Sequence, residues 1–256
     1  MKLIFLNLQT KTIFTPLKNK PLILFLFFTI SFFAQKKNVV VTYKVAYHED
    51  ELLSGGMKDI PSSLMHIKTT YEYALSNADR YVFSLHIADK KSIFMFDQKN
   101  SNTDSFADNT FVRTLYGYLG FVYNANDSIY ENLPYLGNKV YVKTPKIMNW
   151  NLHQESKYIG KHLCFKATNT KVVDNGNGKV FNHPVVAWYC PEIPMQFGPN
   201  GYGNLPGLII ELQVRNVVYG VSHIDFNPVS IFDFSEFDTI KAYNELQIKE
   251  IENEMD

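Results

Sequence analysis

Apolar side chains at every second position are the feature that most constrains the fold of this chain. The stretch 38–48, NVVVTYKVAYH, places its apolar residues on one face of an extended strand: Val39, Val41, Tyr43, Val45 and Tyr47. The same alternation recurs in 65–75 (MHIKTTYEYAL) and 80–87 (RYVFSLHI), and we expect a strand at each. Strands with one apolar and one polar face are typical of antiparallel sheets that expose one side to solvent. The pattern therefore predicts a mostly β fold whose antiparallel sheet is curved, like half a barrel.

The end of the chain changes from a period of two to a helical period. After Ser235 the apolar residues follow helical spacing: Phe237, Ile240, Ile248, Ile251 and Met255. We expect a terminal α-helix over about 236–253, with Ser235 or Asp238 as its cap. No internal repeat and no linker rich in proline, glycine or serine interrupts 35–256, so that range is predicted to be a single domain.

The first 34 residues have the layout of a secretory signal peptide. Lys18 and Lys20 precede an apolar run of 12 residues, Leu22 to Phe33, and a small residue, Ala34, follows it. A membrane-spanning helix needs about 20 apolar residues. We expect removal of 1–34 and export to the periplasm, the outer membrane or the outside of the cell. Cleavage after Ala34 and cleavage after Ser31 both remain open.

The charge balance argues against nucleic acid as a partner. The chain has 25 basic and 25 acidic residues, and the predicted signal peptide contains four lysines and no acidic residue, so the mature chain carries a net charge of −4. A nucleic-acid-binding domain is usually basic, with lysines and arginines gathered on one face.

A stretch rich in glycine and proline, GPNGYGNLPGLIIELQV, occupies 198–214. Pro206 and Gly207 predict a type II turn, in which the proline fixes the second position and the glycine accepts a positive φ at the third. Leu205 and Leu208, on either side of the turn, are expected to enter the core. The glycines fit no phosphate-binding motif, since their spacing is wrong and no helix pattern follows.

Three stretches carry a family resemblance. NWNLHQESKYIGKHLCFKAT (149–168), AWYCPEIPMQFGP (187–199) and NLPGLIIEL (204–212) resemble the GLPGLI family of exported proteins from Bacteroidetes-type bacteria. The family's hexapeptide corresponds to Asn204, Leu205, Pro206, Gly207, Leu208 and Ile209. The resemblance implies export and a β-rich fold, but no assigned activity and therefore no catalytic residue. Asn204 replaces the first glycine, so we expect a positive φ there, which asparagine tolerates better than most residues.

The chain contains two cysteines, Cys164 and Cys190, whose spacing fits no metal-binding motif. They flank a hairpin predicted from the Asn-Gly sequence near 175–178. A tip centred on Gly176 would place them diagonally, whereas a tip centred on Asn177 would place them face to face. A disulfide and two free thiols both remain open.

Excess aromatic residues suggest a binding site. A curved sheet could hold an apolar or amphipathic ligand, lipid or peptide, on its concave side, with 191–203 at the mouth. The candidate groove residues are Trp150, Phe165, Trp188, Tyr189, Phe197 and Tyr202. The alternative is that these side chains only pack the sheet against a helix and loops.

Catalytic motifs are not found, and we predict no cofactor and no bound metal. The leading hypothesis is a non-enzymatic binding domain. The first alternative is an interaction module for an outer-membrane receptor or protease system, using the acidic terminal helix or the polar loop 98–110. The second is a hydrolase built around His48, His66 or His86. The sequence indicates neither the ligand nor the oligomeric state.

Overall fold

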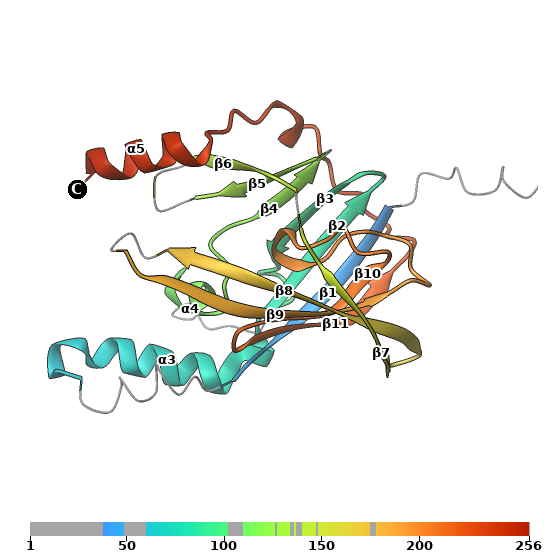
Figure 1. The fold of residues 1–256 in the computed structure, drawn as a ribbon, viewed down its shortest axis with the longest axis horizontal. Helices are drawn as coiled ribbons and strands as arrows, with labels where there is room; N and C mark the ends of the chain where they lie inside the picture. The colour runs from blue at the N-terminus through green and yellow to red at the C-terminus, as the bar shows by residue number, and fades with distance from the viewer. Residues whose placement is uncertain are drawn as a thin grey trace, which may run out of the picture. The chain divides into compact units, whose positions relative to one another are not determined.

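Eleven antiparallel strands form one sheet in the part of the chain that the structure describes (Figure 1). This computed structural model describes residues 38–48, 60–101, 110–125, 127–133, 136, 140–146, 148–174 and 178–255. The predicted signal peptide and most of loop 98–110 lie outside these residues. The strands are β1 (Asn38–Tyr47), β2 (Val82–Ala88), β3 (Lys91–Phe96), β4 (Val122–Ala125), β5 (Ser128–Asn132), β6 (Tyr141–Pro145), β7 (Asn151–Ile159), β8 (His162–Asp174), β9 (Val180–Cys190), β10 (Leu208–Val214) and β11 (Val217–Asp225). Their order across the sheet is β6-β5-β4-β3-β2-β1-β11-β10-β9-β8-β7.

The strand register places the main core on one face of this sheet. Val41 lies opposite Leu85, Leu85 opposite Phe94, and Phe94 opposite Val122, so their side chains share a face. On the other side of β1, Val45 lies opposite Tyr219 and so extends this face into β11. All of these side chains are buried. The alternation in the sequence thus decides which face of each strand is buried, and the predicted antiparallel β fold is confirmed.

The twist of the sheet is visible in Figure 1, where the yellow and orange strands β8 and β9 cross the direction of β1 and β2. The sheet is not closed, because β6 and β7 are its two edges and do not pair with each other. A strongly twisted open sheet of this size tends to curl. The curl brings side chains from its two ends toward a common space, which is the half-barrel arrangement predicted from the sequence.

The predicted strand at 65–75 is wrong, because these residues form helix α3 (Met65–Asn77). Tyr71 and Ala74 are buried and Ala78 follows them, a spacing of three and four residues that matches one helical face. Met65, which the strand reading placed on the apolar face, is 48% exposed. Tyr71 packs edge-on against Tyr47 of β1 with ring centroids 6.0 Å apart. The apolar residues fit both periods, and packing against β1 favours the helix.

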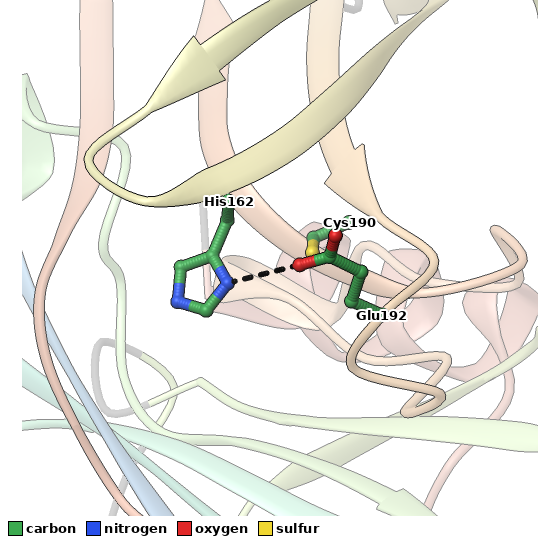
Figure 2. Close-up of side chains that lie close together, drawn as sticks. All are labelled: His162, Cys190 and Glu192. Atoms are coloured by element: carbon green, nitrogen blue, oxygen red, sulfur yellow. Dashed lines mark ion pairs between the residues drawn. The ribbon is translucent and has the colours of Figure 1, made fainter.

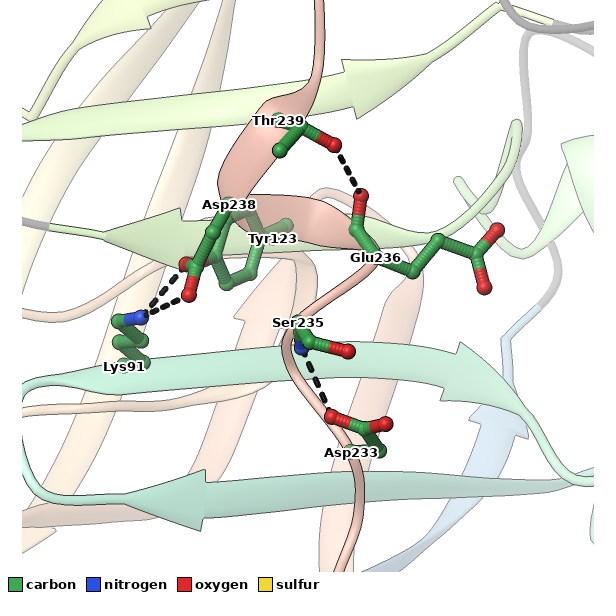
Figure 3. Close-up of polar contacts among 7 residues, drawn as sticks. All are labelled: Lys91, Tyr123, Asp233, Ser235, Glu236, Asp238 and Thr239. Carbon is green, nitrogen blue, oxygen red and sulfur yellow. Dashed lines mark hydrogen bonds and ion pairs between the residues drawn. The ribbon is translucent and has the colours of Figure 1, made fainter.

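The segment 232–240, here called the strap, covers the opposite face of the sheet over β3 and β4 (Figure 3). Phe234 of the strap is buried against Ile93 and Tyr123. Asp238 accepts hydrogen bonds from the Lys91 ammonium at 2.7 Å and from the Tyr123 hydroxyl at 2.9 Å. These hydrogen bonds hold the pKa of Asp238 below its usual value, with the bond from Lys91 the larger cause. The strap is thus attached by aromatic packing and by one polar anchor.

The terminal helix exists but starts later than predicted: α5 spans Glu245–Met255 rather than 236–253. Asn244 and Gln247 form reciprocal caps, since each side-chain oxygen accepts a hydrogen bond from the other's backbone N–H. Before this cap the chain is extended, and Tyr243 forms a parallel bridge with Val142 of β6. Phe237 lies in a short 3-10 turn, η6 (Phe237–Thr239), and belongs to the strap.

Candidate functional site

A cavity of about 480 Å³ lies on the buried face of the sheet. Its strand residues come from both halves of the sheet: Val122, Ile129, Glu131 and Asn132 from β4 and β5, and Lys171, Val173, His183, Val214, Val217 and Tyr219 from β8 to β11. In the sheet order β5 is second and β8 is tenth. Strands so far apart can line one space only if the sheet curls around it, so this face is concave.

Two cross-strand pairs show how Glu131 and Lys171 come to face the cavity. Val122 lies opposite Glu131 in the β4–β5 ladder, and Lys171 lies opposite His183 in the β8–β9 ladder. Residues paired across a ladder point to the same side of the sheet. Glu131 therefore faces the concave space from one end of the sheet, and Lys171 faces it from the other.

The floor of the cavity is formed by buried tyrosines whose hydroxyl groups are already bonded. The Tyr219 hydroxyl donates a hydrogen bond to the Tyr116 carbonyl at 2.8 Å. The Tyr116 hydroxyl donates to the Ala74 carbonyl of α3 at 2.9 Å. Burial raises the pKa of both tyrosines above the ordinary value. These phenols are thus satisfied, neutral groups that fix the floor, and they are poorly suited to proton transfer at neutral pH.

A short 3-10 turn, η5 (Pro199–Gly201), closes one wall. Asn200 adopts a left-handed backbone with φ 49°, and its side-chain amide donates to the Gly117 carbonyl at 3.2 Å. Gly201 also has a positive φ, and a Cβ there would lie 3.0 Å from Val122 and 3.2 Å from Ile129. The glycine lets the turn approach β4 and β5 closely. Tyr202 follows and lines the cavity.

The charged groups of the cavity influence one another. Burial raises the pKa of Glu131, and the positive charge of Lys171 opposes this shift. Burial, together with the nearby charge of Glu131, raises the pKa of Tyr202 to about 12. Glu131 is thus a half-buried carboxyl group within electrostatic reach of a lysine from the far end of the sheet. Such a pair is suited to hold the polar part of a ligand.

The six aromatic residues proposed for a groove do not line one cavity. Tyr202 lines the cavity on the concave face, and the Trp150 ring lies 6.1 Å from it and donates to the Gly203 carbonyl at 2.8 Å. Phe165 and Tyr189 pack together with centroids 6.2 Å apart. Trp188, next in sequence to Tyr189, must point to the opposite face, where Lys157 lies 4.4 Å above its ring.

The remaining groove candidate, Phe197, is buried, and Lys146 lies 4.5 Å above its ring. The predicted mouth segment 191–203 contributes Asn200 and Tyr202 to the cavity lining. The structure therefore brings Trp150 and Tyr202 together and places Trp188 elsewhere. Whether these aromatics contact a ligand stays a prediction.

The corner at 204–209 keeps its predicted burial but not its predicted turn. Asn204 has φ 61°, as expected for the residue that replaces glycine, and both Leu205 and Leu208 are buried. The type II turn is wrong: Gly207 has φ 159°, far from the 80° or so that this turn requires. Gly207 N–H donates to the Leu205 carbonyl at 2.7 Å instead, which makes a three-residue turn around Pro206. Leu208 N–H donates to the Ile193 carbonyl, and Leu208 begins the pairing of β10 with β9, opposite Cys190.

The hairpin register favours the face-to-face arrangement of the two cysteines. Phe165 lies opposite Tyr189 and Asp174 opposite Val180, which centres the hairpin on residue 177. Continued by one residue, this register sets Cys164 opposite Cys190. Both cysteines are buried and free. Burial raises the pKa of Cys164 to about 12 and also raises that of Cys190, so at neutral pH both are thiols and weak nucleophiles.

The three histidines proposed for a hydrolase lie on separate elements. His48 follows β1, His66 is exposed on α3, and His86 lies on β2. The His86 ring packs against Phe232 of the strap at 4.9 Å, and burial lowers its pKa. Since α3 packs on the concave face and the strap on the other, His66 and His86 do not converge on one site.

Glu131, Lys171 and His183 were not selected from the sequence. Each has an ordinary strand context, and 40 residues separate Glu131 from Lys171. The alternation of the strand could have identified Lys171. In the sequence KVVD (171–174), Lys171 shares a strand face with Val173, so a charged residue lies on the same face as an apolar one.

A family model described as "Protein of unknown function (Porph_ging)" matches residues 180–211. The family is associated with Bacteroidetes. The matched stretch contains β9, the segment 191–203 and the Pro206–Gly207 corner, which are parts of the region that carried the GLPGLI resemblance. The match supports a relationship over this stretch, and the GLPGLI name itself stays a prediction.

Comparison with curated protein sequences finds no match. Two crystal forms of PNGF-II resemble the fold, with TM-scores of 0.49 and 0.47 and 14% sequence identity. The superposition covers 84% of this chain and 33% and 32% of the PNGF-II chains, so this chain spans about a third of the length of the protein it resembles. Within the described residues, no helix has the length and apolar character to cross a lipid bilayer.

Proposed function

We propose that this chain is an exported, non-enzymatic binding protein that holds an amphipathic ligand, lipid or peptide, in the concave cavity. The observation that carries this proposal is the cavity itself, which joins an apolar sheet surface to the half-buried Glu131 and the opposing Lys171. Export to the periplasm or the outer membrane is supported by the signal-peptide pattern and by the Bacteroidetes-associated family match.

The size of the cavity suits a small ligand. Its volume of about 480 Å³ lies within the range of about 300–1,000 Å³ typical of ligand pockets. Val122, Ile129, Val214 and Val217 supply an apolar lining for a hydrocarbon chain or an apolar side chain. Burying such a group against them contributes about 25 cal/mol for each Å² removed from water.

The polar part of the ligand would lie between Glu131 and Lys171. A carboxylate taken out of water is costly unless it is hydrogen-bonded or paired, which is why burial raises the pKa of Glu131. A ligand head group that donates to Glu131 and accepts from Lys171 would satisfy both. Binding, rather than catalysis, is favoured because the tyrosine hydroxyls below are committed to backbone carbonyls.

Native mass spectrometry of protein purified from its own cell envelope tests whether a ligand is bound. The protein is then titrated with a fluorescent fatty acid and, separately, with a short apolar peptide. Val214→Trp fills the cavity and is expected to weaken binding at least tenfold, and Lys171→Met is expected to weaken it for ligands with a charged head group. Lys166→Met is the matched control, since Lys166 is also on β8 but pairs with Glu155 outside the cavity. Ligand-free protein that binds neither probe, or equal affinity in Val214→Trp and wild type, would refute the proposal.

A second candidate is an interaction module that uses α5. Leu246 is 73% exposed on this helix, next to Glu245 in a segment rich in acidic residues. An exposed leucine on an acidic helix suits a partner surface that has an apolar centre and a basic rim. Pull-down from envelope extracts with and without 245–255 tests this role, and unchanged partners after the deletion would argue against it.

A further inference from the structure

Three side chains with metal-binding atoms converge at the open end of the β8–β9 hairpin (Figure 2). His162 begins β8, Cys190 ends β9, and Glu192 follows two residues later. The hairpin register, continued by one residue past Phe165 and Tyr189, places residue 164 opposite residue 190. Glu192 lies in the turn that follows β9, where the Ile193 N–H donates to the Cys190 carbonyl at 3.1 Å. The antiparallel pairing thus gathers residues that are up to 30 positions apart in the sequence.

The ligand atoms lie at distances that suit a small ion. His162 Nδ1, Cys190 Sγ and a Glu192 carboxylate oxygen all lie within 4.8 Å of one another. The His162 Nδ1 and Glu192 Oε2 atoms are 3.6 Å apart, too far for a hydrogen bond. Bonds of about 2.0–2.1 Å to a tetrahedral ion would place two such atoms about 3.4 Å apart. The three groups therefore surround a space of the right size.

His162 supplies an independent sign of a missing partner. Its Nδ1 atom is buried and has no hydrogen-bond partner among the described residues. A buried polar atom without a partner destabilises the fold, because it has lost its hydrogen bonds to water. The His162 side chain is 20% exposed and Glu192 is 61% exposed, so an ion and a water molecule can enter from the solvent side. Binding an ion would satisfy this nitrogen.

We propose that His162 Nδ1, Cys190 Sγ and the Glu192 carboxylate bind a Zn²⁺ ion, with water in the fourth position. A mixed set of nitrogen, sulfur and oxygen ligands suits this borderline ion. On binding, the thiol proton is released to solvent as the S–Zn bond forms.

Cys164 is a positioning residue in this arrangement. Its thiol donates to the His162 carbonyl at 3.6 Å. It lies outside the group of three convergent ligands. The site would tie the start of β8 to the segment 191–203, which supplies Asn200 and Tyr202 to the cavity. This role is structural and stands independently of whether the cavity binds a ligand.

The test titrates the full mature chain, reduced and stripped of metal, with Zn²⁺ and with Co²⁺ as a spectroscopic substitute. We expect one ion per chain, a thiolate-to-cobalt charge-transfer band, and a Tm that rises with Zn²⁺. Glu192→Gln and His162→Gln should each weaken binding at least tenfold, and Cys190→Ser should abolish the charge-transfer band. His153→Gln is the matched control, since His153 is an exposed histidine on β7 that bonds Thr168.

Cys164→Ser separates positioning from ligation and should keep the cobalt band with a weaker affinity. Circular dichroism confirms folding, and Glu192→Gln, at an exposed position, keeps the test valid if Cys190→Ser fails to fold. The proposal is overturned if His162→Gln and Glu192→Gln bind as wild type does, or if Cys164→Ser loses the band. A purified chain whose two cysteines form a stable disulfide and which binds no ion would overturn it as well.

Discussion

Gly207 lies so close to Cys190 that a Cβ on the glycine would overlap the Cys190 carbonyl group and the nitrogen of Pro191. The overlapping atoms belong to the backbone, so they cannot move aside as a flexible side chain would. This contact sits where β9 ends and β10 begins to pair with it. The glycine of the corner is thus required by close approach of two backbones rather than by a turn type.

Gly207→Ala is therefore expected to destabilise the protein by about 3 kcal/mol or more, because backbone segments must separate to admit the methyl group. Chemical denaturation measures this loss. Gly220→Ala is the control, since Gly220 lies in β11 with nothing within 4 Å of an added Cβ. Similar midpoints for the two variants would contradict the close-approach explanation.

Asn204 offers a test of backbone conformation at the same corner. Its φ of 61° is costly for residues with an ordinary side chain, and its amide also donates to the Lys146 carbonyl at 2.7 Å. We expect Asn204→Ala to cost about 1–2 kcal/mol. Asn204→Gly should cost less, because glycine accepts the positive φ and only the hydrogen bond is lost. Thermal unfolding of both variants decides the order, and a more stable alanine variant would refute the argument.

Glu131 should make stability depend on pH. Its pKa is raised in the folded state, so between the ordinary value of 4.5 and the raised value the unfolded chain binds fewer protons than the folded chain. The stability contributed by the protonated form is present below 4.5 and is lost as pH rises through the folded pKa. We expect Glu131→Gln to raise the Tm near pH 7 and to flatten this fall in stability. Parallel Tm–pH curves for the two proteins would contradict the shift.

The strap should open when its main apolar anchor is removed. Phe234 is 8% exposed and packs on Ile93 and Tyr123. Phe234→Ala should therefore speed hydrogen exchange of the amides in 232–240 by about 100-fold, which corresponds to a loss of about 3 kcal/mol in the free energy of opening. Val229→Ala is the control, because Val229 is fully exposed. If the amides in 232–240 of Phe234→Ala exchange at wild-type rates, the hydrogen bonds of Asp238 hold the strap without Phe234.

The elements that the sequence predicted correctly are those in which burial of one face is enough to select the secondary structure. In β1, Val39, Val41 and Tyr43 occupy every second position and are buried, whereas the residues between them are only partly buried. In α3 the same kind of spacing was misleading, because Tyr71 and Ala74 fit a helix and only contact with Tyr47 selects it. The start of α5 was misplaced since Phe237 continues the helical spacing but belongs to the strap, where it is partly buried.

The candidate sites were harder to predict because they depend on contacts between distant strands. Glu131 and Lys171 meet only through the curl of the sheet, which depends on the twist summed over many strands. Trp188 and Tyr189 were assigned to one groove, although adjacent residues of a strand point to opposite faces. His162, Cys190 and Glu192 have no recognisable spacing in the chain, and the register of one hairpin brings them together.

The unclosed sheet has a consequence for the width of its concave space. In the described part of the chain, no ladder hydrogen bond joins β6 to β7, so the two ends of the sheet are not fixed to each other. A closed barrel has a bore fixed by its strand number and shear, whereas this sheet can tighten or relax its curl while every existing ladder stays paired. The distance between β5 and β8 can therefore change without the loss of a single ladder hydrogen bond.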